Sequence, residues 1–159
     1  MSEQPGTEER LRRLEDLAAI HELFRQYAAR LDRRDLVGYS QLFADDGEWH
    51  GRNMNAVGGP KAVLAMLRGR FTDGEPNGEC HIVTNPVIEL DGEKAHATSF
   101  GLVLRPGPDG VPAIRMIGYY VDDLVRAADG RWLFAIRRDY LNLPPYMSEQ
   151  LGPPTTWAV

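Results

Sequence analysis

Apolar residues recur at helical spacing in the first part of the chain. Five of them lie three or four positions apart, namely Leu17, Ile20, Phe24, Tyr27 and Leu31. Charged residues fill many of the positions between them. This spacing predicts a long amphipathic helix over residues 8–31 that lies on an apolar surface, with Thr7 as its N-terminal cap.

The second half of the chain has the pattern of β-strands instead. Runs rich in β-branched and aromatic residues, separated by turn signals, cover residues 80–90, 94–105, 113–126 and 131–139. Asp91-Gly92 and Asp129-Gly130 are typical of tight hairpin turns. Because these strands are long and most of their turns are short, they predict a strongly curved antiparallel sheet.

Short elements and loops connect these two parts. Asp35 is placed to cap a short helix over residues 36–43, and Pro60 fits the first turn of a further helix. We expect a first strand to start near residues 48–50, and loops over residues 52–59 and 71–79. Helices followed by a run of strands indicate an α+β domain with helices on one face of the sheet.

The chain length indicates one domain, which we place at residues 9–140. With 159 residues the chain can build one sizeable core but not two. Residues 1–8 are expected to form a flexible lead. Residues 141–159 form a Pro-rich tail with several apolar side chains, which we expect to pack on the domain, a pocket mouth or a neighbouring subunit.

Composition narrows the class of partner. The chain is 43% hydrophobic and 26% charged, which is typical of a globular protein. Its net charge of -5 argues against nucleic acid and anionic membranes. The single cysteine, Cys80, excludes an intramolecular disulfide and a cysteine-based metal cluster. No apolar run is long enough to span a membrane and the N-terminus is polar and acidic, so we expect a cytoplasmic protein.

His81 is the residue whose position suggests chemistry. It stands at the start of an otherwise apolar strand, on the same face as Val83 and, if the strand stays regular, Asn85. If that face is the inner one, the imidazole points into an apolar cavity, where it can accept a proton near neutral pH.

Asp32 stands at the end of the first helix without an evident structural task. An acid at that end opposes the helix dipole at a cost of about 0.3–1 kcal/mol. The residues alone leave two interpretations open. Asp32 is either a solvated turn residue paired with Arg33 or Arg34, or a functional carboxylate.

Several segments together resemble a known superfamily. They are IHELFRQYAARLDRRD (20–35), LFADDGEW (42–49), HIVTNPVIELDGEKAHA (81–97), GYYVDDLVR (118–126) and DGRWLFAIRR (129–138). In this order they resemble the nuclear transport factor 2-like superfamily, and within it the SnoaL-like and scytalone dehydratase-like branch. The resemblance implies a cone-shaped α+β barrel, a strongly curved antiparallel or mixed sheet whose N-terminal helices close an apolar cavity.

The resemblance also implies roles for individual residues. Scytalone dehydratase, bile acid 7α-dehydratase and hexachlorocyclohexane dehydrochlorinase look similar at an aspartate ending the first helix and a histidine on the cone. The matching positions here are Asp32 and His81, so the resemblance implies His81 as general base and Asp32 as its orienting partner. Tyr27 could donate a hydrogen bond to a substrate oxygen, or it could be a core residue of the helix stripe.

Further residues are candidates for lining a substrate pocket. These are Trp49, Met54, Asn85, Phe100, Leu102, Met116, Tyr120 and Phe134. Core packing is a simpler account of several of the apolar ones, and Asn85 could instead brace a bend. Tyr119 and Tyr120 alternate across their strand, and parity alone does not say which of them faces the cavity.

The remaining histidines and a pair of acids are expected outside the site. His96 lies in a charged segment and His21 lies beside the helix stripe, so we expect both at the surface. His50 should point away from the side on which Trp49 lies. Asp122-Asp123 is interpreted as a solvated or turn-bracing pair.

Several other types of site fit poorly. Asp32 and His81 give two candidate metal ligands where zinc uses three or four, and no Gly-rich motif follows a strand and opens a helix. We therefore expect no metal and no cofactor. A ketosteroid isomerase-like acidic base fits the histidine poorly, and the Asp-Arg-Asp set of a limonene epoxide hydrolase-like site is not recognisable.

Together these observations predict a cofactor-independent lyase, a dehydratase or related cyclase. Its ligand would be a small, mostly apolar ring compound, such as a polyketide, a steroid-like molecule or an aromatic one. Two alternatives stay open: a non-catalytic binding or assembly module of the same fold, and an accessory subunit resembling the small subunit of ring-hydroxylating dioxygenases. The resemblance also implies a homodimer or homotrimer.

Overall fold

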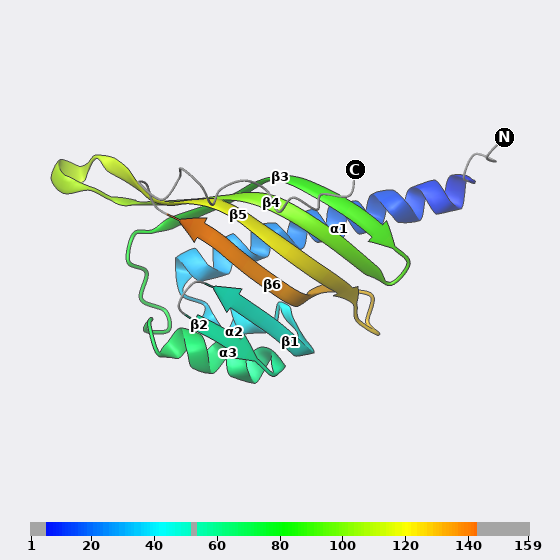
Figure 1. Cartoon of the computed structure of the whole chain (residues 1–159), viewed down its shortest axis with the longest axis horizontal. Coiled ribbons are helices and arrows are strands. Elements are labelled where there is room, and N and C mark those ends of the chain that lie inside the picture. The colour runs from blue at the N-terminus through cyan, green and yellow to red at the C-terminus, as the bar shows by residue number, and fades with distance from the viewer. Residues whose placement is uncertain (1–5, 52–53, 143–159) are drawn as a thin grey trace.

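One six-stranded mixed sheet, with helices packed on its inner face, makes up the fold (Figure 1). The computed structural model describes residues 6–51 and 54–142. The helices are α1 (Thr7–Arg33), α2 (Leu36–Ser40) and α3 (Gly59–Arg68). The strands are β1 (Phe43–Gly51), β2 (Met54–Val57), β3 (Cys80–Asp91), β4 (Lys94–Pro106), β5 (Pro112–Arg126) and β6 (Trp132–Asn142), and a 3₁₀ turn (Pro108–Gly110) joins β4 to β5.

The strand order is β2-β1-β6-β5-β4-β3. β1 and β6 run parallel, whereas each other neighbouring pair is antiparallel. This confirms the predicted α+β fold with a curved sheet. The sheet is open rather than closed into a barrel, because β2 and β3 are its two edges and α1 packs against β3.

α1 follows the predicted apolar stripe. Its buried apolar side chains are Ile20, Leu23, Phe24, Tyr27 and Leu31. Leu14, which we placed beside the stripe, is exposed. The first turns of α1 extend past the edge of the sheet (Figure 1). The prediction for Thr7 is wrong: Gly6 is the capping residue, no side chain bonds there, and Thr7 is already helical.

α2 ends earlier than predicted, because β1 begins sooner. The carboxylate of Asp35 caps α2 as expected, accepting from the backbone N–H of Gly38 at 2.8 Å. α2 stops at Ser40, and the carbonyl of Leu42 accepts a hydrogen bond from the backbone N–H of Phe134 in β6 at 2.9 Å. Pairing with β6 therefore brings residues 43–47 into β1.

The predicted loop over residues 52–59 contains a strand instead. β2 pairs with β1, with Ala56 opposite Trp49. Its sequence gives little strand signal, because Ala56 is the one buried side chain of this short edge strand. α3 then begins at Gly59 with Pro60 in its first turn, as predicted.

Aromatic rings form the centre of the core, between the helices and the inner face of the sheet. Neighbouring ring centroids are 4.8–6.0 Å apart in a cluster of Phe24, Tyr27, Tyr39, Phe43, Tyr120 and Phe134. All of these side chains are buried. Such packing fixes the ring orientations and therefore the positions of the tyrosine hydroxyl groups.

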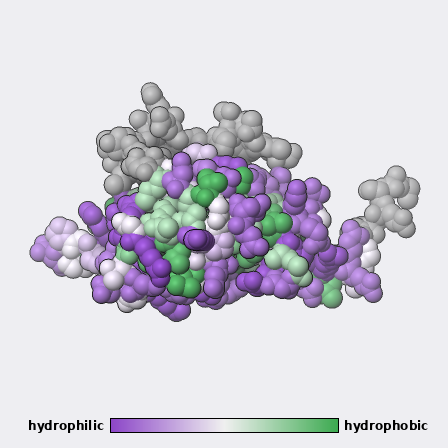
Figure 2. All heavy atoms as spheres, turned by 90° about the horizontal axis from the view of Figure 1, so that it is seen from below, coloured by the Kyte–Doolittle hydropathy of each residue, from purple (hydrophilic) through white to green (hydrophobic). Residues whose placement is uncertain are grey.

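The molecular surface is mostly hydrophilic on the face seen in Figure 2, where apolar side chains form several separate patches. Within the described residues, no helix combines the length and the apolar character needed to cross a membrane. The Pro-rich tail beyond residue 142 and the first five residues of the predicted lead lie outside the described residues.

Candidate active site

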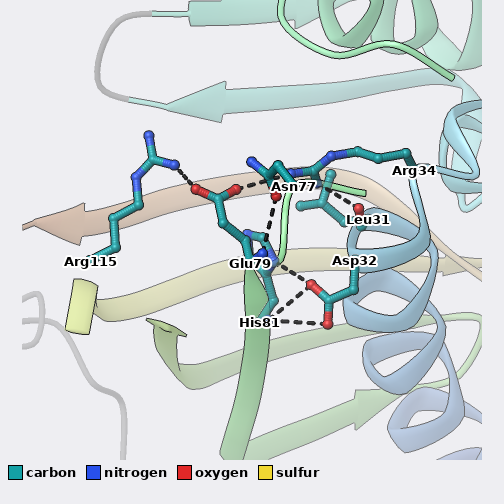
Figure 3. Close-up of polar contacts among 7 residues, drawn as sticks. All are labelled: Leu31, Asp32, Arg34, Asn77, Glu79, His81 and Arg115. Atoms are coloured by element: carbon teal, nitrogen blue, oxygen red, sulfur yellow. Dashed lines mark hydrogen bonds and ion pairs between the residues drawn. The ribbon is translucent and has the colours of Figure 1, made fainter. Parts of the chain in front are cut away.

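Asp32 and His81 meet where the end of α1 crosses the start of β3 (Figure 3). Nδ1 of His81 lies 2.7 Å from Oδ1 of Asp32. The backbone N–H of His81 also donates to the same carboxylate, at 3.0 Å to Oδ1 and 3.2 Å to Oδ2. The imidazole side chain is 8% exposed and the carboxylate 26% exposed. The two residues thus form a partly buried pair joined by more than one hydrogen bond.

The tautomer of His81 follows from this contact. An ionised carboxylate only accepts hydrogen bonds, so Nδ1 carries the proton that it donates to Asp32. Nε2 is then the basic nitrogen of the ring, and within the described part of the chain it has no hydrogen-bond partner.

The backbone around Arg34 explains why Asp32 is held here. Arg34 adopts a left-handed conformation (φ 56°) that ends α1, and its side chain is buried. Its Nη1 donates to the carbonyl of Leu31 at 2.6 Å, which fixes the last turn of the helix. Burial lowers the pKa of Arg34, and the nearby charge of Asp32 opposes that shift.

A cavity of about 90 Å³ lies beside His81, enclosed by helices, loops and the inner face of the sheet. Its apolar walls include Leu31, Trp49, Met54, Met66, Phe71 and Met116. Its polar lining includes Tyr27, Tyr39, Tyr120, Glu79, His81 and Arg115. A more open groove of about 370 Å³ runs between α1 and β3 and reaches the pair from outside, where Asp32 and His81 line it together.

The phenol side chains of Tyr27, Tyr39 and Tyr120 gather at the cavity wall. The ring of Tyr27 lies 4.8 Å from that of Tyr39 and 5.7 Å from that of Tyr120, measured between centroids. Burial, with smaller contributions from neighbouring groups including Tyr27, raises the pKa of Tyr39 and Tyr120 well above the ordinary value. Both phenols therefore stay protonated and can donate hydrogen bonds.

The structure brings most of the predicted site residues together. His81, Tyr27, Trp49, Met54, Met116 and Tyr120 line the cavity, and Asp32 lies behind His81. Tyr120 rather than Tyr119 faces inward, and Tyr119 stacks on Tyr140 instead. Phe134 is fully buried in the aromatic cluster, so it packs behind the cavity and does not line it.

Besides Phe134, three further predicted lining residues do not line the cavity. Phe100 and Leu102 alternate with the buried Ser99 and Val103, so they belong to the outer face of β4. Asn85 is exposed and has a φ of 51°, where an irregularity between Thr84 and Val87 interrupts β3. The extra residue shifts the parity of the strand, so Asn85 leaves the face of His81.

The other histidines lie where the sequence placed them. His96 is exposed and pairs with Asp123, Nδ1 to Oδ1, at 3.0 Å. His50 pairs with Glu48 while Trp49 is buried and lines the cavity. His21 is exposed on α1 beside the outer groove. In the described part of the chain no three His, Cys, Asp or Glu side chains group as metal ligands.

The prediction that Asp122 is solvated is wrong, because this residue is fully buried. Its Oδ2 lies 3.4 Å from Nη1 of the equally buried Arg137, which is its register partner on β6. The guanidinium of Arg137 lies 3.8 Å from the ring centroid of Tyr27 and 3.7 Å from that of Tyr120. Parity with the inward-facing Tyr120 is a signal that could have placed Asp122 on the inner face.

Opposing effects act on the pKa values of this buried pair. Burial raises the pKa of Asp122 to about 7, and the charge of Arg137 opposes the rise. Burial disfavours the charge on Arg137, but Asp122 and the surrounding tyrosines raise its pKa, so Arg137 stays cationic. A guanidinium under aromatic faces keeps favourable contacts in either ionisation state of Asp122.

Comparison with known sequences and structures gives a consistent picture. The sequence model of the SnoaL-like domain matches residues 12–138. Comparison with curated proteins gives no match. An NTF2-like protein with a cystatin-like fold from Novosphingobium aromaticivorans is 24% identical, with a TM-score of 0.75, over 94% of this chain and 96% of its own. At that identity the likeness concerns the fold alone.

Two further solved structures are informative. A provisionally assigned scytalone dehydratase from Novosphingobium aromaticivorans is 26% identical, with a TM-score of 0.66, over 82% of this chain and 87% of its own. A protein from Catenulispora acidiphila in complex with S-DNPA is 26% identical, with a TM-score of 0.66, over 80% of this chain and 92% of its own. Proteins similar to this chain therefore include one that binds a small molecule.

Proposed function

This chain belongs to the SnoaL-like domain family, and we propose that it is a cofactor-independent lyase, a dehydratase or a related cyclase. Its substrate is a small, mostly apolar ring compound. The observation that carries the proposal is the 2.7 Å contact between Nδ1 of His81 and Oδ1 of Asp32 at the edge of a cavity with mainly apolar walls. The likeness to a provisionally assigned scytalone dehydratase supports it.

His81 acts as the general base in this proposal. Its Nε2 takes a proton from a carbon next to an activating group, and the electron pair of that C–H bond forms the new double bond as the leaving group departs. In a dehydration the proton then passes from Nε2 to the departing hydroxyl, which leaves as water. Asp32 holds the required tautomer and stabilises the imidazolium while it exists.

Tyr27 supplies a hydrogen bond to the substrate oxygen that gains negative charge. It lines the cavity together with Tyr39 and Tyr120, so a carbonyl or hydroxyl group in the cavity is within range of phenol donors. Trp49, Met54 and Met116 provide apolar contacts for the ring. In such surroundings the ion pair formed by His81 and Asp32 is worth more than it is in water.

The test compares two histidines that each contact a carboxylate. His81→Ala should abolish turnover of a panel of cyclic β-hydroxy ketones, since it removes the base. His96→Ala is the matched control, because His96 pairs with Asp123 at the surface, and it should keep full turnover. Full turnover by His81→Ala would sink the proposal.

A non-catalytic binding module is the second candidate function. Its support is the hydrogen bonding from the backbone N–H of His81 to Asp32, which gives that carboxylate a structural role as well. A module of this kind would bind ring compounds equally well with alanine at position 81 and would turn none of them over.

We also propose a homodimer or homotrimer that covers the outer face of the sheet. Ile82, Val87 and Phe100 expose apolar surface on that face. Light scattering of the purified chain measures the mass directly. A monomer at micromolar concentration would count against this assembly.

A further inference from the structure

A charged network of three side chains, Arg34, Glu79 and Arg115, lies at the cavity wall next to His81 (Figure 3). Glu79 lies two residues before His81 on the way into β3, and its side chain is 6% exposed. Its Oε2 accepts a hydrogen bond from Nη2 of Arg34 at 3.0 Å, and its Oε1 pairs with Nη1 of Arg115. Each oxygen of the Glu79 carboxylate therefore contacts a different guanidinium.

At one end of this charged network, several contacts hold the Arg34 side chain in place. The Arg34 side chain is 1% exposed and donates to Glu79, to Leu31 and to the side-chain oxygen of Asn77. Its guanidinium also lies 4.0 Å from the ring centroid of Phe71, another residue of the cavity wall. Glu79 is consequently held in a fixed place, ready to orient Arg115.

A β-bulge turns Arg115 toward the cavity. Ile114 pairs with Leu104 and Met116 pairs with Val103, so Arg115 is an extra residue in β5. Both Arg115 and Met116 line the cavity, whereas consecutive residues of a regular strand point to opposite faces. Bulges of this kind re-aim side chains, and here the side chain is a cation.

Charged side chains of both signs lie in or beside the cavity. Glu79 supplies one negative charge against the positive charges of Arg34 and Arg115. Arg70 adds another cation to the lining. Its Nη1 contacts Sδ of Met54 at 3.1 Å, and within the described residues no carboxylate pairs with it. Asp139 also lines the cavity and has an interaction of its own.

Arg115 retains unused binding capacity. A guanidinium has five N–H donors, and Glu79 contacts one edge of it. The Arg115 side chain is 34% exposed, so the rest of the guanidinium is open to a ligand.

We propose that Arg115 binds a carboxylate group on the substrate, with Glu79 as its positioning residue. The ligand class is therefore an apolar ring that bears a carboxylate, because a planar guanidinium binds a carboxylate through two parallel hydrogen bonds. Arg70 adds a further positive charge to the lining of the same cavity. This inference deepens the proposed function of the same cavity, but binding does not require His81 to act as a base.

The experiment measures binding of 2-naphthoate and of its neutral isostere 2-naphthamide by calorimetry on the full chain. The wild-type protein should bind the carboxylate at least about tenfold more tightly than the amide, as expected for a charge-assisted hydrogen-bonded pair. Arg115→Met should remove this preference and leave amide binding unchanged. Arg131→Met is the control, since Arg131 pairs with Asp129 in the turn before β6, and it should keep the preference.

Several results would overturn the inference. The inference fails if naphthoate binds the wild-type protein no more tightly than naphthamide does. The inference also fails if Arg115→Met weakens the binding of both ligands equally, because Arg115 would then stabilise the cavity and would not bind the carboxylate. If Arg115→Met does not fold, two other variants provide the test. Arg115→Lys keeps the charge and must therefore keep part of the preference for the carboxylate. An unchanged preference in Arg115→Gln, which lacks the charge, contradicts the inference.

His81→Ala separates this inference from the proposed chemistry. That variant should lose turnover and keep the preference for the carboxylate. A protein that prefers naphthoate through Arg115 but retains turnover in His81→Ala would support the ligand class and reject the proposed base.

Discussion

Asp32 holds His81 at two points, the ring nitrogen Nδ1 at 2.7 Å and the backbone N–H at 3.0 Å. One carboxylate therefore fixes both the path of the chain into β3 and the orientation of the imidazole. The ring cannot turn about its χ angles without losing the first contact, while the second keeps the residue itself in place. Asp32 therefore has two roles, holding the backbone at the start of β3 and orienting the imidazole, and different substitutions can separate them.

Asp32→Asn and Asp32→Ala should differ in what they lose. The amide oxygen of asparagine can still accept the backbone N–H of His81, but a neutral amide no longer stabilises the imidazolium that forms when His81 takes a proton. Turnover should fall by roughly 10²–10⁴-fold, with little change in the free energy of unfolding.

Asp32→Ala should lower turnover to a similar extent and also destabilise the fold, by about 1–3 kcal/mol for an unpaired, partly buried donor. Steady-state turnover and urea unfolding measure the two effects. Full turnover in Asp32→Asn would contradict the orienting role.

Tyr27→Phe tests which phenol acts on the substrate. If Tyr27 donates to the developing oxyanion, removing its hydroxyl should lower the turnover number by roughly 10²–10³-fold, as for loss of one such donor. Tyr39→Phe is the matched comparison, because Tyr39 lines the same cavity and its ring lies 4.8 Å from that of Tyr27. A larger effect in Tyr39→Phe would transfer the role to Tyr39.

Arg137→Met should destabilise the protein strongly. It leaves the carboxyl of Asp122 buried without its cation, which typically costs about 3–5 kcal/mol when one partner of a buried pair is removed. Asp122→Asn should cost less, since the guanidinium keeps its contacts with the rings of Tyr27 and Tyr120. Urea unfolding of both single variants and of the double variant measures the coupling, and strictly additive losses would show that the pair does not interact.

The pH dependence of stability should carry a contribution from Asp122. Its pKa is raised from 3.8 to about 7 in the folded state, chiefly by burial, so folding favours the protonated form. The stabilisation is fully present below pH 3.8 and is lost as the pH rises through 7.

Asp122→Asn mimics the neutral acid and should lack this component. The free energy of unfolding of the wild type should therefore fall relative to that of the variant as the pH rises from 5 to 8. A difference that stays constant over this range would mean that Asp122 does not titrate there.

Gly59→Ala and Gly74→Ala separate backbone strain from a steric clash. Both glycines have a positive φ, 70° and 73°, so each substitution should cost about 1–2 kcal/mol for the left-handed backbone alone. A Cβ at Gly59 would also lie 2.0 Å from the carbonyl oxygen of Asp45, whereas a Cβ at Gly74 meets open space. Thermal unfolding should show the larger loss for Gly59→Ala, and equal losses would mean that the start of α3 can shift.

Much of the fold could be predicted from local pattern. The stripe from Ile20 to Leu31 made α1, and the Asp91-Gly92 turn joined β3 to β4. Asp35 capped α2 because its side chain needs only the backbone N–H of Gly38, three residues away. Each of these features depends on residues close together in sequence, so periodicity and turn chemistry were sufficient.

Features that depend on distant strands could not be predicted in this way. β1 starts at Phe43 because Phe134 of β6 pairs with it, and the short β2 exists because β1 offers it an edge. The bulges at Asn85 and Arg115 reverse the expected facing of each residue, and nothing in the local alternation announces them. Asn85 was therefore assigned to a cavity that it does not line.

Apart from β2, the sequence by itself determined the elements and their order, and it also indicated the two residues of the central pair. Resemblance indicated Asp32 and His81, and the residue types alone gave them a carboxylate and an imidazole suited to proton transfer. Only the tertiary structure decided that Glu79, Arg34 and Arg115 meet beside that pair and that Asp122 is buried against Arg137. Their contacts join residues far apart in the chain, and such contacts depend on strand register and burial, which one-dimensional spacing does not contain.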